Sequence, residues 1–297
     1  MRSAAVVGTG LIGTSIALAL RARGITPHLL DADPDAARTA ADLGAGVVGA
    51  PRAPVDLAVI AVPPQHVAAC LHEQQARGLA QDFTDVSSVK VRPLEEAARL
   101  GCDLTRFVGG HPMAGREQSG PLAARADLFR GRPWVLTPAG SAGDRAVVRA
   151  RELAELCGAR PVVMEPDQHD RAVALVSHTP HLVASLLAAR LLHGDESHLR
   201  LAGQGLRDAT RIAAGDADLW TDILSSNASA VAEVLTELVL ELDAAVDALR
   251  ELAKAPSEPG TAGAHLNDAL ARGVRGRGLI QERAAGGLSL TGVAVGA

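Results

Sequence analysis

The sequence has 297 residues, of which 47% are apolar and 21% are charged, and its net charge is −5. This length predicts about two domains, and this composition is typical of a folded globular protein rather than a disordered chain. The acidic balance and the lack of a basic stripe exclude nucleic acid and an anionic membrane as expected partners. Three scattered cysteines show no metal-ligand spacing and indicate free thiols in a reducing compartment.

The N-terminal stretch combines an apolar strand pattern with a glycine-rich turn. The strand Ala4–Gly8 runs into residues 8–13 (GTGLIG), and an apolar-periodic helix continues to about Leu20. The glycines interrupt what would otherwise resemble a secretory signal, so we expect a cytoplasmic protein. A second strand ends at Asp31, about 20 residues after the turn, which completes the dinucleotide-binding fingerprint.

Asp31 favours NAD over NADP as the cofactor. Its carboxylate is placed to accept hydrogen bonds from the ribose hydroxyls, and it would repel a 2′-phosphate. The alternative is a glycine-rich turn in a domain of this type that has lost its ligand.

Strand and helix patterns alternate through the first half of the chain. The expected strands are Ala4–Gly8, Pro27–Asp31, Asp56–Val62, Asp82–Val86, Arg106–Gly110, Trp134–Thr137 and Pro161–Met164. This alternation predicts an α/β Rossmann-type domain with a doubly wound, mainly parallel sheet. Strand patterns then stop, so we place the boundary between an α/β domain, residues 1–165, and an all-α domain, residues 166–297.

The carboxyl ends of the strands are expected to meet at one edge, where such sheets bind ligands. The residues expected to contact the cofactor are Gly8, Gly10, Leu11, Ile12, Gly13, Asp31, Val62, Pro63 and Ser87. The same edge receives His111, which follows an apolar run and is fixed by Pro112. A neutral imidazole suits the role of general base in hydride transfer, and Ser88 is placed to hydrogen-bond the imidazole or a substrate hydroxyl. The competing interpretation of His111 is a structural histidine that caps a turn.

The helical half carries further polar candidates. His178 and His181 are three residues apart, as metal ligands can be, but no third ligand has suitable spacing and Pro180 would disturb the turn. We therefore expect no metal and favour substrate contact by one histidine. Arg211 lies in a mainly apolar region, where it is either a solvated side chain or a bidentate clamp on a carboxylate.

A long helix is predicted from Ser225 to Leu252. Its apolar stripe is heptad-like and comprises Ala228, Val231, Leu235, Leu238, Leu242, Ala245, Leu249 and Leu252. Further apolar residues lie off the stripe, so more than one side of the helix should be covered. A subunit interface is the favoured cover, and burial within its own domain is the alternative. A linker is expected at Pro256–Gly263.

Five segments together resemble the prephenate/arogenate (cyclohexadienyl) dehydrogenase family of tyrosine biosynthesis. They are GTGLIGTSIALAL, DVSSVK, HPMAGRE, DQHDRAVALVSHTPH and LRDATRIAAGDADLW, and they span the chain from about Ala4 to Leu252. The resemblance implies an NAD-binding domain, a helical substrate-binding and dimerisation domain, and a homodimer formed through the C-terminal helices. It also implies NAD-dependent oxidative decarboxylation of prephenate to 4-hydroxyphenylpyruvate.

By the same resemblance, His111 and Ser88 are catalytic, with Ser88 orienting the base. Arg211 and His181 would hold the small-molecule substrate, and Glu117, Arg116 and Trp220 would lie near it. Arg116 replaces the small hydroxyl residue of many relatives, and Gln204 interrupts a glycine run. These departures leave arogenate and 4-amino-4-deoxyprephenate open as alternative substrates.

Two further functional classes fit the sequence less well. A non-catalytic dinucleotide-binding protein would have no need for His111, Ser88 and Arg211 together. A β-hydroxy acid dehydrogenase would use a helical-domain lysine for proton transfer, and the only lysine there is Lys254, which lies outside the motif segments.

Overall fold

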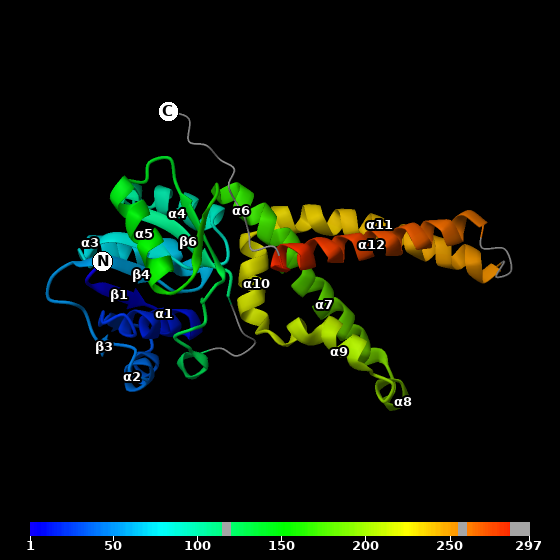
Figure 1. The fold of residues 1–297 in the computed structure, drawn as a ribbon, viewed down its shortest axis with the longest axis horizontal. Helices are drawn as coiled ribbons and strands as arrows, with labels where there is room; N and C mark the ends of the chain where they lie inside the picture. The colour runs from blue at the N-terminus through cyan, green and yellow to red at the C-terminus, as the bar shows by residue number, and fades with distance from the viewer. Residues whose placement is uncertain (115–119, 255–259, 286–297) are drawn as a thin grey trace. The chain divides into compact units, whose positions relative to one another are not determined.

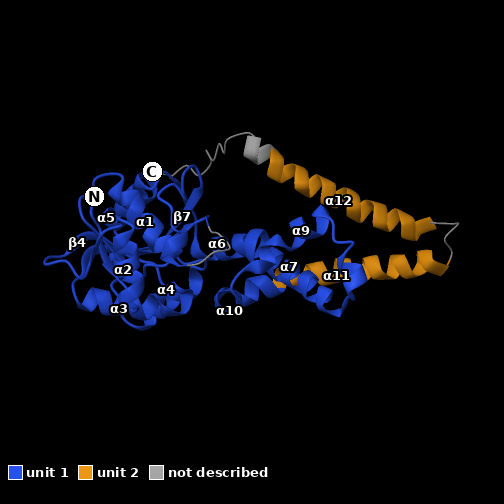
Figure 2. Ribbon diagram, turned by 90° about the horizontal axis from the view of Figure 1, so that it is seen from below, with its two compact units in different colours: residues 1–232 blue, residues 233–297 orange. Residues whose placement is uncertain are grey.

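The computed structural model describes residues 1–114, 120–254 and 260–285. The chain divides into two compact units, residues 1–232 and residues 233–297 (Figure 2). The first unit holds the sheet and the helices that pack against it. The second unit holds most of one long helix and all of the helix that follows it.

An eight-stranded sheet with the order β3-β2-β1-β4-β5-β6-β7-β8 organises the first unit. The strands are β1 Ala4–Val7, β2 His28–Leu30, β3 Val47–Val48, β4 Val55–Ile60, β5 Ala80–Asp85, β6 Phe107–Pro112, β7 Pro133–Pro138 and β8 Arg160–Val163. Strands β1 to β6 are all parallel to one another. Strand β7 is antiparallel to β6, and β8 is parallel to β7. The predicted doubly wound, mainly parallel sheet is confirmed. Strand β3 was not predicted, since two residues are too few to give a pattern.

Helices cover both faces of this sheet (Figure 1). They are α1 Leu11–Arg21, α2 Pro34–Asp42, α3 Val67–Ala76, α4 Val91–Arg99 and α5 Asp144–Leu156, with short 3-10 turns η1 Pro64–His66, η2 Leu104–Arg106 and η3 Pro121–Ala123. Alternate residues of β1 point to opposite faces, as a strand requires. Ala4 and Val6 join the apolar core of one face, whereas Ala5 and Val7 join that of the other.

The strand order places the glycine-rich turn at the topological switch point. From β1 the chain builds outward to β2 and β3, and it then returns to add β4 on the other side of β1. The helices that follow β1 and β4 therefore diverge, and a crevice opens beyond the carboxyl ends of these two strands.

After β8 the described chain is helical. The elements are α6 Pro166–Val173, the π-helical turn η4 Ala174–His178, α7 Thr179–Arg190, η5 Leu191–His193, α8 Glu196–Leu199, α9 Gln204–Thr210, η6 Arg211–Ala214, α10 Ala217–Ser226, α11 Ala228–Lys254 and α12 Gly260–Ala285. The wide turn η4 directly precedes Pro180, whose ring lacks an N–H and would collide with a regular preceding turn. The predicted disturbance of the helix at Pro180 is therefore confirmed.

The helical stretch Pro166–His193 has the length and mean hydropathy, 1.5, of a membrane span. It nevertheless carries the buried polar side chains of His169, Asp170 and His178. The apolar window is 33% buried within the described chain, and length and composition alone are weak evidence that this stretch spans a membrane.

The long C-terminal helix differs from its predicted bounds. Ser225 belongs to α10, and the chain bends by 94° at Asn227 before α11 begins. Helix α12 begins at Gly260, so the predicted linker was too long, and residues 256–259 of it lie outside the described residues. Within the second unit, Arg272 of α12 makes two hydrogen bonds to the carboxylate of Glu241 on α11.

Candidate active site

The glycine-rich turn has the geometry of a phosphate cradle. Gly8 has φ +98°, and a Cβ added there would lie 2.3 Å from the carbonyl oxygen of Ala61. A Cβ on Gly13 would lie 1.9 Å from the carbonyl oxygen of Gly8, so this residue lets α1 pack against the turn. A Cβ on Gly10 would meet nothing within 4 Å. The open side of the turn is therefore at Gly10, the N-cap of α1, where free N–H groups favour a phosphate.

Asp31 braces this turn from the end of β2. Its carboxylate accepts hydrogen bonds from the backbone N–H of Thr9 at 2.5 Å and from the Thr9 hydroxyl at 2.8 Å. It also accepts a bond from the backbone N–H of Asp33 at 2.9 Å. The structure therefore brings the predicted acidic residue against the glycine-rich turn, at the mouth of the crevice.

A buried ion pair joins the ends of β5 and β6. The ammonium of Lys90 contacts the carboxylate of Asp85, and it donates to the carbonyl oxygen of Gly110 at 2.6 Å. Asp85 also accepts the backbone N–H of Gly110 at 2.9 Å and that of Ser87 at 3.1 Å. Both charged side chains are almost fully buried, so the pair fixes the backbone immediately before His111.

The two glycines that precede His111 make this close packing possible. A Cβ on Gly109 would lie 2.4 Å from the hydroxyl of Thr137 and 3.2 Å from the side chain of Lys90. A Cβ on Gly110 would lie 2.6 Å from the carbonyl oxygen of Asp85. Any larger residue at either position would push β6 away from its neighbours.

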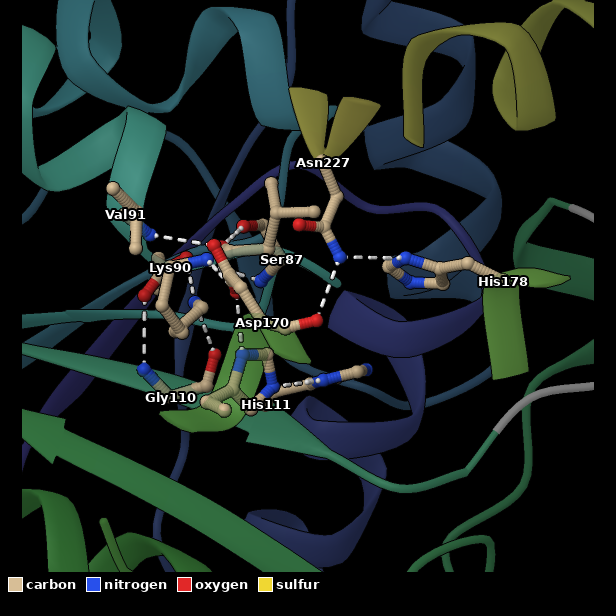
Figure 3. Close-up of polar contacts among 11 residues, drawn as sticks. Ser87, Lys90, Val91, Gly110, His111, Asp170, His178 and Asn227 are labelled. Carbon is tan, nitrogen blue, oxygen red and sulfur yellow. Dashed lines mark hydrogen bonds and ion pairs between the residues drawn. The ribbon is translucent and has the colours of Figure 1, made fainter. Parts of the chain in front are cut away.

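His111 is the outer member of a chain of three side chains, of which Figure 3 labels the two ends, His111 and Asp170. Its Nδ1 lies 2.8 Å from Nε2 of His169 on α6, and Nδ1 of His169 lies 2.7 Å from Oδ1 of Asp170. The two imidazole rings meet edge to face. Asp170 in turn accepts the backbone N–H groups of Lys90 at 2.8 Å and Val91 at 3.0 Å. One carboxylate therefore ties α6 to the start of α4.

Burial and neighbouring ionisable groups keep His111 neutral. Burial is the main cause that lowers its pKa well below the usual 6.5, and His169, Lys90 and His178 add repulsion against a positive charge. Burial likewise lowers the pKa of Lys90, whereas its partner Asp85 acts in the opposite direction. A neutral imidazole at this edge can accept a proton.

The helices after β8 contribute a bridging asparagine and a stacked pair of rings. Nδ2 of Asn227, at the bend between α10 and α11, donates to the carbonyl oxygen of Asp170 at 2.8 Å and lies 3.1 Å from Nδ1 of His178. The ring of His181 stacks on that of Trp220, with centroids 3.5 Å apart. Gly215 provides the room for this stack, because a Cβ there would lie 2.5 Å from the indole nitrogen.

The remaining predicted site residues differ in how closely they approach His111 and the glycine-rich turn. Ser88, which was expected to bond the imidazole of His111 or a substrate hydroxyl, follows β5 and is half-buried, and Nδ1 of His111 is bonded to His169. Ser87 uses its hydroxyl to donate to the carbonyl oxygen of Val89 at 2.7 Å, within the turn itself. Arg211 is exposed at the start of η6, which packs against α7. Arg116 and Glu117 lie outside the described residues. The other residues expected at the cofactor, Leu11, Ile12, Val62 and Pro63, lie after β1 and β4, beside the switch point.

Sequence reasoning missed the residues behind His111. Asp85, Lys90, His169, Asp170 and Asn227 carry the buried polar network, although four of them occur in the motifs DVSSVK and DQHD. The available signal was weak, because the lysine and the His-Asp pair stand among other polar residues in these motifs. Such residues are seldom buried unless they are paired.

Models of two protein families match this chain in succession. The prephenate dehydrogenase nucleotide-binding domain matches residues 16–163, and the prephenate dehydrogenase dimerization domain matches residues 165–256. The probable prephenate dehydrogenase NovF of Streptomyces niveus is 44% identical over 284 residues, which cover 95% of this chain and 78% of that protein.

Solved structures agree with these matches. Prephenate dehydrogenase from Aquifex aeolicus, in complex with hydroxyphenyl propionate and NAD+, has a TM-score of 0.79 and 26% identity, covering 93% of this chain and 98% of its own. The arogenate dehydrogenase of Synechocystis has a TM-score of 0.72 and 27% identity, covering 93% of this chain and 99% of its own.

Proposed function

The chain belongs to the prephenate dehydrogenase family, and we propose that it catalyses the NAD-dependent oxidative decarboxylation of prephenate to 4-hydroxyphenylpyruvate in tyrosine biosynthesis. The observation that carries this proposal is His111, a buried neutral imidazole braced at the same edge of the sheet as the glycine-rich turn of a nucleotide-binding domain. A base in this position is what an alcohol needs when it loses a hydride and a proton together.

NAD is the proposed cofactor because the residues at the switch point fit it. The open side of Gly10 admits a pyrophosphate close to the backbone, and the start of α1 supplies N–H donors. Asp31, already turned toward this loop, is suited to a ribose diol and would repel a 2′-phosphate. The Aquifex aeolicus relative was crystallised with NAD+.

His111 accepts the proton of the ring hydroxyl in the proposed reaction. The substrate consists of a ring with a hydroxyl and a carboxylate on opposite carbons, and NAD, when bound, takes up the hydride from the hydroxyl-bearing carbon. Loss of the proton to His111 allows the ring carboxylate to leave as carbon dioxide, which makes the ring aromatic. Ser88 is placed on the neighbouring strand end to hold the substrate hydroxyl.

The helical side would bind the rest of the substrate. His181 and Trp220 present a stacked, largely apolar surface, and Arg211 is the proposed partner of a substrate carboxylate. Arg116 and Glu117, which follow His111 in the same segment, are proposed to lie near the substrate side chain.

A substrate panel tests this proposal. NADH formation would be measured with prephenate, arogenate and 4-amino-4-deoxyprephenate, each with NAD+ and with NADP+. We expect prephenate with NAD+ to give the largest kcat/KM. A preference for arogenate would be in line with the Synechocystis relative, and a preference for the ring-amine substrate would point to Arg116 as a selecting residue. No turnover with any of the three would overturn the proposal.

We further propose that the protein is a cytoplasmic homodimer. The dimerization-domain match covers α11 up to residue 256, and both long helices carry exposed apolar side chains. On α11 these include Leu240, 66% exposed, and Leu242, 54% exposed, and on α12 they include Leu270 and Val274. Exposed apolar side chains on long helices are typical of subunit interfaces.

A further inference from the structure

The strongest unassigned feature of the first unit is the buried pair His169 and Asp170. Neither was singled out by sequence reasoning, and His169 is 0% exposed. The pair stands directly behind His111, on the Nδ1 side of its ring. The chemistry of these three groups fixes where the protons lie.

Asp170 has to act as the acceptor at the inner end. Both of its carboxylate oxygens accept backbone N–H groups, from Lys90 and from Val91. A carboxylate oxygen accepts hydrogen bonds and donates none, and each oxygen of Asp170 already faces a backbone donor. The contact of 2.7 Å to His169 therefore requires that Nδ1 of His169 carries the hydrogen.

The next contact follows from the first. A neutral His169 with its hydrogen on Nδ1 offers a bare Nε2, and this atom lies 2.8 Å from Nδ1 of His111. His111 must then donate from Nδ1. Its own Nε2 is left without a hydrogen, and among residues 1–114, 120–254 and 260–285 nothing hydrogen-bonds that atom.

We propose that His169 and Asp170 are positioning residues that hold His111 in the Nδ1–H tautomer, so that Nε2 of His111 is the atom that accepts the substrate proton. This inference rests on the proposed function for its catalytic meaning, but the tautomer itself is a property of the free protein. Once Nε2 is protonated, the Nδ1–H bond to His169 strengthens, because a cationic donor forms a shorter and stronger hydrogen bond.

The surroundings support this arrangement. The charged and titratable groups around His111 are Lys90 and Asp85 on the β5 side, His169 and Asp170 on α6, and His178 on η4. Repulsion from His169 is one cause of the low pKa of His111, so the two rings do not share the site as two cations. Asn227, at the bend between α10 and α11, donates to the backbone carbonyl of Asp170 and so helps to hold the chain of three side chains in place.

Two substitutions of His169 distinguish a positioning role of this side chain from a purely structural one. In His169→Gln the amide oxygen takes the place of Nε2 and still accepts from His111. In His169→Leu no acceptor remains. We expect His169→Leu to lower kcat by about 10–100-fold with little change in KM, and His169→Gln to retain most of the activity. His198→Leu, on the exposed helix α8, is the matched control.

The direct readout is the nitrogen NMR spectrum of the full chain labelled with 15N-histidine, in which His111 is assigned from a His111→Asn sample. In the wild type and in His169→Gln we expect the nitrogen signals of His111 to be those of the neutral tautomer with hydrogen on Nδ1. In His169→Leu we expect these signals to be lost. An Nε2–H pattern in the wild type, or an unchanged kcat in His169→Leu, would overturn the inference. The spectrum needs no substrate, so it stands even if the substrate panel fails. The wild-type and His169→Gln spectra decide the matter if His169→Leu does not fold.

Discussion

At the scale of single residues, the chemistry depends on a histidine that remains neutral in a buried site. The position of His111 at the carboxyl end of a strand could be predicted from the sequence, because an apolar run that ends in Gly-Gly-His-Pro marks where the strand stops. It could not reveal the partner on Nδ1, since His169 lies 58 residues away in the chain and approaches only after α6 packs on the sheet. Ser88 was expected to orient the base because it follows the neighbouring strand and because the family resemblance implies that role.

The low pKa of His111 leads to a prediction for the pH dependence of the reaction. A general base is active when deprotonated, so activity is lost only when the pH falls through its folded-state pKa. Because that pKa lies well below 6.5, kcat/KM for the preferred substrate should be flat from about pH 6.5 to 8 and should decline only in more acidic solution. A profile whose acidic limb is centred at or above pH 6.5 would contradict this placement of the base.

At the scale of elements, the turn from β1 to α1 was the most predictable part of the molecule. Each of its glycines is required for a different steric reason, and the spacing of glycines in residues 8–13 predicted the turn. The networks between elements were less predictable. The Lys90–Asp85 pair and the Asn227 bridge depend on the packing of β5, β6, α6 and α10, which are far apart in the chain.

Two glycine substitutions in this turn should have opposite consequences. In Gly10→Ala the new methyl group meets no protein atom and φ remains −70°, so the fold should be retained. The methyl group would occupy the proposed pyrophosphate position and weaken NAD+ binding by about tenfold or more, equivalent to roughly 1.4 kcal/mol.

Gly13→Ala should instead destabilise the fold, because its methyl group would overlap the backbone of Gly8. Calorimetric titration of NAD+ and thermal unfolding of both variants would check this contrast. Equal NAD+ affinity in Gly10→Ala and the wild type would argue against a phosphate at this turn.

At the scale of the whole molecule, the fold class and the change from a sheet to helices followed from the sequence, whereas the course of the long helices did not. The 94° bend at Asn227 separates α10 from α11, and the predicted apolar stripe, which begins at Ala228, lies entirely after this bend. Periodicity reports which face of a helix is covered. It does not report where the axis turns.

The buried histidines should make folding stability depend on pH. Burial lowers the pKa of His178 to about 4 from 6.5, so below pH 6.5 the unfolded chain binds a proton that the folded chain does not. The contribution of His178 is fully present above pH 6.5 and is lost as the pH falls toward 4, by up to roughly 3 kcal/mol.

Denaturant unfolding at pH 7.5 and pH 5 would measure this loss. In His178→Asn the amide can still accept from Asn227, and this variant should show a smaller loss between the two pH values than the wild type. An identical pH dependence in the two proteins would exclude His178 as a source.

The proposed dimer depends on apolar side chains that the single chain leaves exposed. Leu242→Glu on α11 should weaken association, because it buries a charge in an apolar contact. Glu251→Gln on the same helix, also exposed, is the control and should remain dimeric. Light scattering after size-exclusion chromatography gives the mass of each species. A monomeric wild type at micromolar concentration would contradict the proposed homodimer.

The central claim is that His111 removes the substrate proton while the ring loses a hydride and carbon dioxide. The most direct measurement follows NADH and 4-hydroxyphenylpyruvate together during prephenate oxidation by the wild type and by His111→Asn, with NAD+ binding measured for both. We predict equal amounts of the two products in the wild type, and a kcat reduced by at least about 10²-fold in His111→Asn with NAD+ affinity retained. Turnover of prephenate by His111→Asn at the wild-type rate would contradict the account.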